Sequence, residues 1–304
     1  MVNITEKSNT LRIAIAEATV NVSSQDTIDA ILNRTVPKGD VFEMSKAAGL
    51  LGIKKTPDLL PDCHPIPIEF AAITYQIAGL SVRIEVEVRT IYKTGVEVEA
   101  MHGASVVALN MYDMLKPIDK GIEIASIKLC YKKGGKTDFK DKFLDRKNLK
   151  AAVIVCSDTI SAGQKEDKAG KAIIAKLEQC KVNIEAYTII PDEKTAIQEK
   201  LIQYHEANYN LVIFTGGTGL SIRDVTPEAI EPLLDRRIPG AEETIRAYGQ
   251  NRMRYAMLSR SVVGIKGATL VMALPGSTNG AKESMEAIFP EILHVFGTLN
   301  GGGH

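Results

Sequence analysis

The chain has 304 residues, enough for two domains, and its hydrophobic content of 45% and charged content of 24% are ordinary for globular proteins and argue against disorder. Its 37 basic and 37 acidic residues cancel, only 5% of residues are aromatic and none is Trp. A general nucleic-acid binder would need a basic excess and stacking rings, so we expect no nucleic-acid partner.

The four cysteines lie far apart and form no CxxC motif. This spacing argues against a zinc or iron–sulfur cluster and indicates a reducing compartment. No run approaches the roughly 18 apolar residues of a membrane span, and the first ten residues contain no apolar core. We therefore expect a cytoplasmic protein with no membrane partner.

The first half alternates between strand and helix patterns. Strands are expected over 12–22, 69–77, 82–89 and 123–131, and helices over 27–33, 40–48 and 96–116. Residues 82–89 alternate apolar and polar side chains without a fault, as in a half-buried antiparallel strand. The order β-α-β-β-α-β predicts a ferredoxin-like α+β domain.

A highly charged segment, 132–150, follows this domain and contains Gly134 and Gly135. Such a composition is typical of a linker, and we place the domain boundary near residue 146. The expected domains are therefore 1–145 and 146–304.

The second half alternates short apolar strands with helices. Strands are expected over 151–156, 184–190, 211–214 and 269–274, and helices over 168–179, 195–207, 227–234, 242–253 and 281–295. This alternation predicts an α/β domain with a doubly wound parallel sheet. Ligands of such sheets bind outside the carboxyl ends of the strands, where Ser157, Asp192, Gly216 and Pro275 fall.

A glycine-rich turn follows the apolar strand at 211–214. Three glycines between Gly216 and Gly219 allow positive φ angles and close approach of a ligand to the backbone. Thr226, before Pro227, predicts a capped helix start, and together these features predict a site for phosphate and metal. The alternative is a tight structural turn, since neither GxxxxGK[ST] nor a complete GxGxxG motif is present.

The long helix predicted over 96–116 carries polar residues along one face. Glu99, His102, Asn110, Asp113 and Lys116 follow the 3–4 spacing of a single stripe. Buried charge is unfavourable unless paired, so the stripe predicts a polar cavity; the alternative is a structural ion pair between Asp113 and Lys116.

Five motifs of the first half, taken together, resemble the MoaC family of cyclic pyranopterin monophosphate synthases. They are Lys38–Val41, Asp62–Pro65, Lys93–Ala100, Tyr112–Met114 and Gly134–Lys136. The resemblance implies a ferredoxin-like fold, hexamers with sites at subunit contacts, and conversion of 3′,8-cyclo-7,8-dihydro-GTP into cyclic pyranopterin monophosphate and pyrophosphate, without a cofactor.

The same resemblance implies roles for individual residues. Asp113 would be the acid/base residue, assisted by Lys38 and Lys116. Such a set suits ring opening, which moves protons, and loss of pyrophosphate, which needs cations. The residues implied to bind substrate are Asp62, Cys63, His64, Glu97, Val98, Glu99 and Lys136, the last at the triphosphate. Many relatives have an apolar residue where Asp62 stands.

The second half resembles the MogA/MoaB family of molybdopterin-binding proteins. The resemblance rests on Ser157–Gly170, Pro191–Glu193, Thr215–Gly219, Arg223–Pro227 and Leu274–Gly280. It implies a domain that binds molybdopterin and, in the catalytic members, adenylylates its phosphate with Mg-ATP.

By this second resemblance, Asp192 and Asp224 would be catalytic and would hold Mg²⁺, as two carboxylates at strand ends can. The substrate-binding residues it implies are Ser157, Asp158, Gly216, Gly217, Thr218, Gly219 and Ser277.

Two hypotheses follow from these resemblances. The first is a bifunctional enzyme of molybdenum cofactor biosynthesis, with pterin substrates, Mg²⁺ and ATP in the second domain, and assembly as a homo-oligomer, a trimer or a hexamer. The second is a single enzyme whose second domain only binds molybdopterin or drives oligomerisation. A different nucleotide-binding domain is a further alternative.

Overall fold

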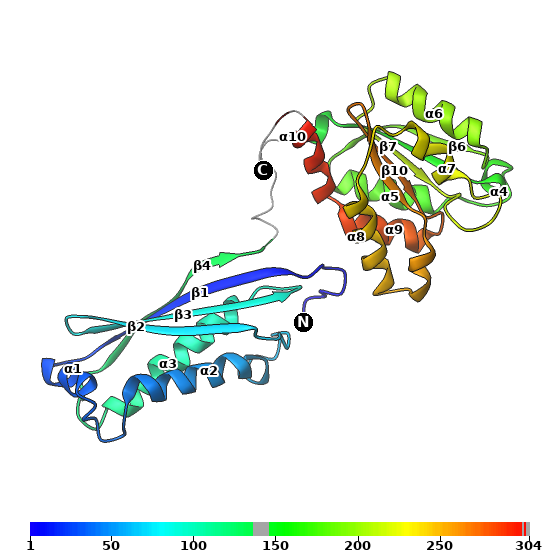
Figure 1. Ribbon diagram of the computed structural model, residues 1–304. Coiled ribbons are helices and arrows are strands. Elements are labelled where there is room, and N and C mark those ends of the chain that lie inside the picture. The colour runs from blue at the N-terminus through cyan, green and yellow to red at the C-terminus, as the bar shows by residue number, and fades with distance from the viewer. Residues whose placement is uncertain (136–145, 300, 302–304) are drawn as a thin grey trace. The chain divides into compact units, whose positions relative to one another are not determined.

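The computed structural model describes residues 1–135, 146–299 and 301. The chain divides into two compact units, Met1–Lys140 and Asp141–His304, each organised around its own apolar core (Figure 1). The predicted position of the boundary, between residues 145 and 146, stays a prediction.

The first unit is an antiparallel sheet with helices packed on one face (Figure 1). The strand order is β2-β3-β1-β4, and β1 pairs antiparallel with both β3 and β4. This is the predicted ferredoxin-like α+β arrangement, with two helices between the first two strands. The elements are β1 (Thr10–Asn21), α1 (Gln25–Leu32), α2 (Val41–Leu59), β2 (Phe70–Ala78), β3 (Ser81–Tyr92), α3 (Glu97–Leu115) and β4 (Glu123–Lys133).

The core of this unit forms between the sheet and the helices α2 and α3. Alternate residues of β3, from Val82 to Val88, are fully buried, as the alternation predicted. α2 continues to Leu59, beyond the predicted end at residue 48, because the helix runs through Gly49 and Gly52. A Cβ at Gly52 would lie 2.8 Å from Val106, so its glycine allows α2 to pack closely against α3.

The second unit is a six-stranded α/β sheet in the order β6-β5-β7-β10-β9-β8. The strands are β5 (Lys150–Cys156), β6 (Asn183–Ile190), β7 (Leu211–Thr215), β8 (Arg236–Arg237), β9 (Val262–Lys266) and β10 (Thr269–Leu274). The helices are α4 (Asp158–Ser161), α5 (Ala169–Gln179), α6 (Lys194–Glu206), α7 (Thr226–Ile230), α8 (Pro239–Gln250), α9 (Thr278–Ile288) and α10 (Val295–Leu299). Short 3₁₀ turns occur at Arg146–Asn148 (η1), Glu231–Leu233 (η2), Arg254–Leu258 (η3) and Glu291–His294 (η4).

The sheet is parallel over its central strands and mixed at one edge. β5, β6, β7 and β10 are parallel, as predicted, whereas β9 runs antiparallel to β10 and β8 antiparallel to β9. The sequence interpretation missed β8 and β9. β9 is joined to β10 by the tight turn at Gly267, whose φ is +56°, so it returns as a hairpin without a crossover helix.

No helix within residues 1–135 and 146–299 is long and apolar enough to cross a membrane. All four cysteines lie in this part and carry free thiols, with Cys156 and Cys180 buried.

Candidate functional sites

The carboxyl end of α3 carries an ion-paired cluster around Asp113. The Lys38 ammonium lies 2.6 Å from Asp113 Oδ2 and also donates to the Asp113 backbone oxygen, at 2.9 Å. Lys116 lies 2.7 Å from Asp113 Oδ1. Hydrogen bonds from Lys116 and Lys38 lower the pKa of Asp113 to about 2, and the carboxylate raises the pKa of Lys116. The three residues of the first unit that the family resemblance implied to be catalytic therefore form one contiguous group.

A second cluster lies at the amino end of α3. Glu99 is only 2% exposed, and burial raises its pKa. Cys63 Sγ donates to Glu99 Oε1 at 3.5 Å, while Oε2 is buried with no hydrogen-bond partner among the described residues. Burial, together with the charge of Glu99, raises the pKa of the Cys63 thiol to about 11. On the same turn, Glu97 forms an ion pair with Lys132 at 3.6 Å.

The middle of the polar stripe between these clusters is hydrogen-bonded to α2, and the predicted polar cavity stays a prediction. His102 Nδ1 is hydrogen-bonded to Thr56 Oγ1 at 3.0 Å, and the Asn110 amide donates to Ser45 Oγ at 3.0 Å. Both partners belong to α2. The stripe is therefore the polar part of the contact between two helices, and the ion pair of Asp113 with Lys116 exists alongside it.

The other residues proposed to bind substrate are exposed or held by the first residues of the chain. Asp62 forms an ion pair with the amino group of Met1 at 3.0 Å, and His64 Nε2 is hydrogen-bonded to the Val2 oxygen at 2.9 Å. Val98 is exposed, and Lys136 lies outside the described residues.

The two clusters of the first unit are well separated along α3. Glu99 and Asp113 are 14 positions apart, which is about 21 Å along a helix rising 1.5 Å per residue. Within one chain the structure therefore does not bring Cys63, His64, Glu97 and Glu99 together with Asp113.

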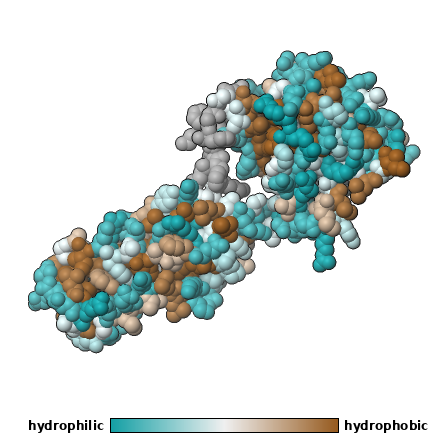
Figure 2. All heavy atoms as spheres, in the orientation of Figure 1, coloured by the Kyte–Doolittle hydropathy of each residue, from teal (hydrophilic) through white to brown (hydrophobic). Residues whose placement is uncertain are grey.

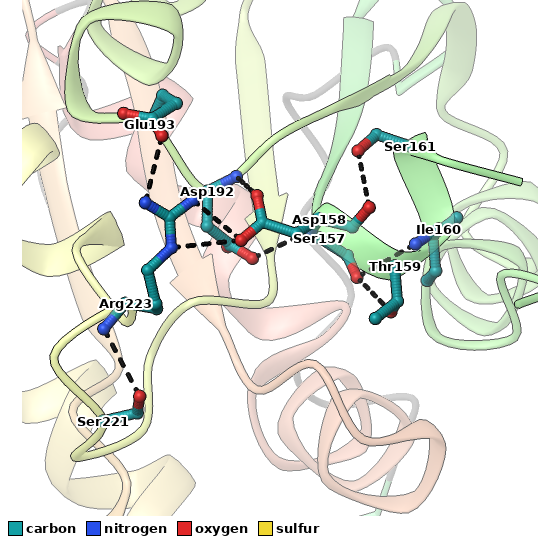
Figure 3. A network of polar contacts seen from close by, with 9 residues as sticks. All are labelled: Ser157, Asp158, Thr159, Ile160, Ser161, Asp192, Glu193, Ser221 and Arg223. Carbon is teal, nitrogen blue, oxygen red and sulfur yellow. Dashed lines mark hydrogen bonds and ion pairs between the residues drawn. The ribbon is translucent and has the colours of Figure 1, made fainter. Parts of the chain in front are cut away.

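In the second unit, polar loops meet at the carboxyl ends of the parallel strands, as predicted. The backbone N–H of Asp158, after β5, donates to Asp192 Oδ2 at 3.1 Å, and that of Asp192, after β6, donates to Asp158 Oδ1 at 3.0 Å (Figure 3). Each carboxylate thus accepts a hydrogen bond from a backbone N–H of the other loop. This reciprocal pair fixes the two loops against each other.

Arg223 joins these two loops to the glycine-rich turn (Figure 3). Its Nη2 and Nε donate to Asp158 Oδ2 at 2.7 and 3.1 Å, and its Nη1 donates to Glu193 Oε1 at 3.0 Å. The guanidinium lowers the pKa of Asp158. The sequence interpretation gave Arg223 no role in the site, although it lies beside Asp224.

Asp192 contrasts with Asp158, because one of its oxygens has no partner. Oδ1 is buried and accepts no hydrogen bond from any residue that the structure describes. Burial raises the pKa of Asp192, and the nearby carboxylates of Asp158 and Asp224 raise it further. An unsatisfied carboxylate oxygen beside other carboxylates is suited to a hard divalent cation.

Protein side chains alone do not complete such a metal site. Among the described residues, no group of three or more His, Cys, Asp and Glu side chains is arranged to hold a metal ion. Mg²⁺, however, commonly uses one or two carboxylates, with substrate phosphates and water as its other ligands. Asp192 and Asp224 suit that partial role.

The glycine-rich turn has the backbone freedom that the sequence predicted. Gly216 and Gly217 have φ angles of +104° and +61°. A Cβ at Gly217 would lie 2.9 Å from Asp192 Oδ1, so the turn passes directly beside the unsatisfied oxygen. Within the described residues, the N–H groups of Gly217, Thr218 and Gly219 have no hydrogen-bond acceptor.

The prediction that Thr226 caps the following helix is wrong. Its hydroxyl donates to the Gly216 oxygen at 2.9 Å, and its N–H donates to the Gly217 oxygen at 3.0 Å. The residue therefore stabilises the turn rather than α7, which is a single short turn of helix.

Hydroxyl groups and a second arginine complete the surroundings of the turn. Ser157 and Ser277 accept hydrogen bonds from Ile160 and Gly280 and so cap α4 and α9. Asp224 Oδ2 accepts from the Ser221 N–H at 2.9 Å. Arg260 donates to the backbone oxygens of Gly219 and Asp224. The sequence gave no signal for Arg260, because it lies outside every motif of the second half.

Comparisons with known proteins agree with this two-unit organisation. Residues 1–135 match the MoaC family, and residues 152–294 match a family described as "Probable molybdopterin binding domain". A cyclic pyranopterin monophosphate synthase of Pelobacter propionicus is 44% identical over 140 residues, covering 45% of this chain and 86% of that protein. A crystal structure of the molybdopterin biosynthesis enzyme MoaB from Thermus thermophilus is 37% identical and has a TM-score of 0.48, covering 50% of this chain and 97% of that one.

Similarity to bifunctional relatives extends over the whole chain. The molybdenum cofactor biosynthesis bifunctional protein of Chlorobaculum tepidum is 36% identical over 304 residues, covering 100% of this chain and 96% of its own. The predicted fusion of two domains is thereby confirmed, and the chain belongs to the family of bifunctional molybdenum cofactor biosynthesis proteins, with a MoaC unit followed by a MogA/MoaB-like molybdopterin-binding unit.

Proposed function

We propose that the first unit converts 3′,8-cyclo-7,8-dihydro-GTP into cyclic pyranopterin monophosphate and pyrophosphate. We propose that the second unit transfers AMP from Mg-ATP to the phosphate of molybdopterin. The lysine-paired Asp113 carries the first assignment, and the unsatisfied Asp192 oxygen beside the glycine-rich turn carries the second.

The electrostatics around Asp113 give its proton-transfer role a direction. A pKa of about 2 keeps the carboxylate ionised near neutral pH, so Asp113 is able to accept a proton, although it is a weak base while both lysines are paired with it. The raised pKa of Lys116 keeps its ammonium protonated, so Lys116 is a proton donor. Lys38 and Lys116 also supply the positive charge that a leaving pyrophosphate requires.

The separation of the two clusters on α3 supports a shared site. A single substrate molecule cannot span about 21 Å along the helix and contact both Asp113 and Glu99 in one chain. We therefore propose a homo-oligomer, a trimer or a hexamer, in which Asp113 of one subunit faces the Cys63–Glu99 cluster of another. Exposed apolar side chains on the first unit, including Leu51 and Leu109, are consistent with such contacts, and brown apolar areas interrupt its visible face (Figure 2).

In the second unit, the free N–H groups of Gly217, Thr218 and Gly219 would donate to phosphate oxygens. Asp192 and Asp224 would hold Mg²⁺, which, when bound, screens the charge on the nucleotide phosphates. The oxygen of the molybdopterin phosphate would attack the α-phosphorus of ATP, and pyrophosphate would leave. The chain's own contribution is to hold both phosphate groups beside the turn and the two carboxylates.

Two assays on the full-length chain test these assignments. The first measures cyclic pyranopterin monophosphate formed from 3′,8-cyclo-7,8-dihydro-GTP. The second follows pyrophosphate released from Mg-ATP, with and without molybdopterin. We expect molybdopterin-dependent release; binding of molybdopterin without release would show that the second unit is a non-catalytic binding module instead.

A further inference from the structure

Arg260 lies between η3 and β9, yet its side chain contacts both ends of the segment that carries Asp224. Nε donates to the Gly219 oxygen at 2.8 Å, and Nη2 donates to the Asp224 oxygen at 2.7 Å. The Arg260 backbone N–H also donates to the Thr218 oxygen, at 3.3 Å. One residue from outside the glycine-rich turn therefore closes the segment from Gly219 to Asp224.

The remaining arm of the guanidinium is also engaged. Nη1 forms an ion pair with Glu228 on α7, directly after the same segment. Hydrogen bonds from a charged donor are roughly twice as strong as neutral ones. A planar guanidinium donates in several fixed directions at once, whereas a lysine ammonium is a point charge on a flexible stem. The set of acceptors around Arg260 thus matches arginine specifically.

The Asp224 carboxylate lies where these contacts hold the backbone. A Cβ at Gly219 would lie 2.8 Å from Asp224 Oδ2, so the carboxylate packs against the residue to which Arg260 Nε donates. The same turn passes Asp192 Oδ1 at Gly217. Displacing Gly219 or Asp224 would therefore change the spacing between the two carboxylates.

We propose that Arg260 is a positioning residue for the divalent cation, because it fixes Asp224 relative to Asp192. The inference rests on the proposed role of these two carboxylates in holding Mg²⁺. Arg260 does not contact the ion; it acts through the backbone of the turn. Supporting contacts of this kind typically change metal affinity about 10- to 100-fold when removed.

The test measures metal binding without turnover. The full-length chain is titrated with Mn²⁺ alone as the probe, and bound ion is followed by loss of the free-ion electron paramagnetic resonance signal. Arg260→Ala should weaken Mn²⁺ binding by the about 10- to 100-fold of a lost supporting contact. Arg146→Ala is the matched control, because Arg146 lies in η1, directly before β5 and therefore at the amino end of the parallel strands, opposite the end that carries the turn, and its affinity should be unchanged.

Chemical rescue separates positioning from a general loss of structure. Tens of millimolar guanidinium should restore Mn²⁺ binding to Arg260→Ala, whereas the same concentration of urea should not. A variant weakened only by misfolding would be weakened further by guanidinium. If Arg260→Ala does not fold, as judged by its thermal transition, Arg260→Lys replaces it, and its Mn²⁺ affinity should fall by at least several-fold.

The outcomes distinguish this inference from the proposed function. A wild-type chain that binds no Mn²⁺, either alone or together with a non-hydrolysable ATP analogue, would overturn the metal site itself. Wild-type binding that is equal in Arg260→Ala or Arg260→Lys would overturn only the role of Arg260, as would a failure of guanidinium to rescue a folded Arg260→Ala variant. Mn²⁺ binding without AMP transfer would leave the role of Arg260 standing and reject the adenylylation.

Discussion

Asp113 and Asp192 are the same residue type in opposite electrostatic surroundings. Asp113 is half-exposed at the end of a long helix, and its two oxygens are paired with Lys38 and Lys116. Asp192 lies on a loop at a strand end, and one of its oxygens is buried without a partner among the described residues. The pKa of Asp113 is lowered to about 2 by its lysine partners, and that of Asp192 is raised by burial.

The contrast shows how each unit obtains positive charge. The first unit places the ammonium groups of Lys38 and Lys116, its own side chains, beside Asp113. The second unit has carboxylates in excess around Asp192, and Arg223 is already paired with Asp158 and Glu193. Under the proposed function, its site would accept a cation that arrives with a nucleotide.

The largest expected effect tests the first half of this contrast. Asp113→Asn keeps the shape of the side chain but removes the proton acceptor. We expect synthesis of cyclic pyranopterin monophosphate to fall by the ~10²–10⁴ typical of a lost acid/base group, with AMP transfer unchanged as an internal control. Turnover within a few-fold of wild type would reject the assignment of Asp113.

Asp224→Asn tests the second half. The substitution removes a charge but little volume, so folding and molybdopterin binding should survive. AMP transfer should fall by at least ~10², the scale of one lost electrostatic contact in a transition state. Pterin synthesis by the first unit should not change. Undiminished pyrophosphate release by the variant would show that Asp224 holds no essential cation.

A stability measurement addresses Asp192 directly. At a free Mg-ATP concentration of 100 times Kd, ligand linkage stabilises the folded state by about 2.7 kcal/mol, which corresponds to ~5–10 °C in the Tm of a unit of this size. We expect this shift in the second unit of wild type and not in Asp192→Asn. Equal shifts in the two proteins would place the ion elsewhere.

The same variant has a defined dependence on pH without metal. Because the folded-state pKa of Asp192 is raised, the stability that its protonated form contributes is fully present below the unfolded value of 3.8 and is lost as pH rises through the folded-state pKa. Asn cannot ionise. Asp192→Asn should therefore have a higher Tm than wild type at neutral pH and approach the wild-type value in acid.

The smallest expected effect concerns the independence of the two units. Each unit has its own apolar core, so a fragment beginning at Arg146 should be soluble and unfold cooperatively, with a Tm within a few degrees of that unit in the full chain. Aggregation of the fragment, while the whole chain stays soluble, would show that the predicted boundary is wrong.

Periodicity and turn chemistry predicted most of the fold. The alternation of β3, the apolar run of β7 and the length of α3 are local properties of the sequence, and the structure confirms them. The continuation of α2 past Gly49 and Gly52 could not be predicted from the sequence. These two glycines are needed because α3 packs closely against α2 at both positions. β9 was missed because the residues before it form a turn of 3₁₀ helix, η3, whose sequence does not indicate that a strand follows.

The candidate sites were predicted less completely, for a physical reason. Family motifs identified Asp113 and Asp192, and spacing along the helix raised the ion pair of Asp113 with Lys116 as an alternative, but neither predicted the contact of Asp113 with Lys38 or the unpartnered oxygen of Asp192. That difference depends on where Lys38 and the Asp158 loop lie in space. The hydrogen bonds of His102 and Asn110 to α2 were not predicted, because spacing shows which residues share a face and not what that face contacts.

The ion pairs of Arg223 have a consequence for ligand selectivity. Its guanidinium is shared by Asp158 and Glu193, which come from two different loops. An anion that recruits Arg223 must first compete with both carboxylates, so the exchange favours ligands that return as many contacts as they displace. Chloride offers a single acceptor atom and cannot compensate, whereas a phosphate ester presents several oxygens, two of which can bind the guanidinium in a bidentate geometry. The site would thus discriminate against the abundant small anions of its surroundings before any chemistry begins.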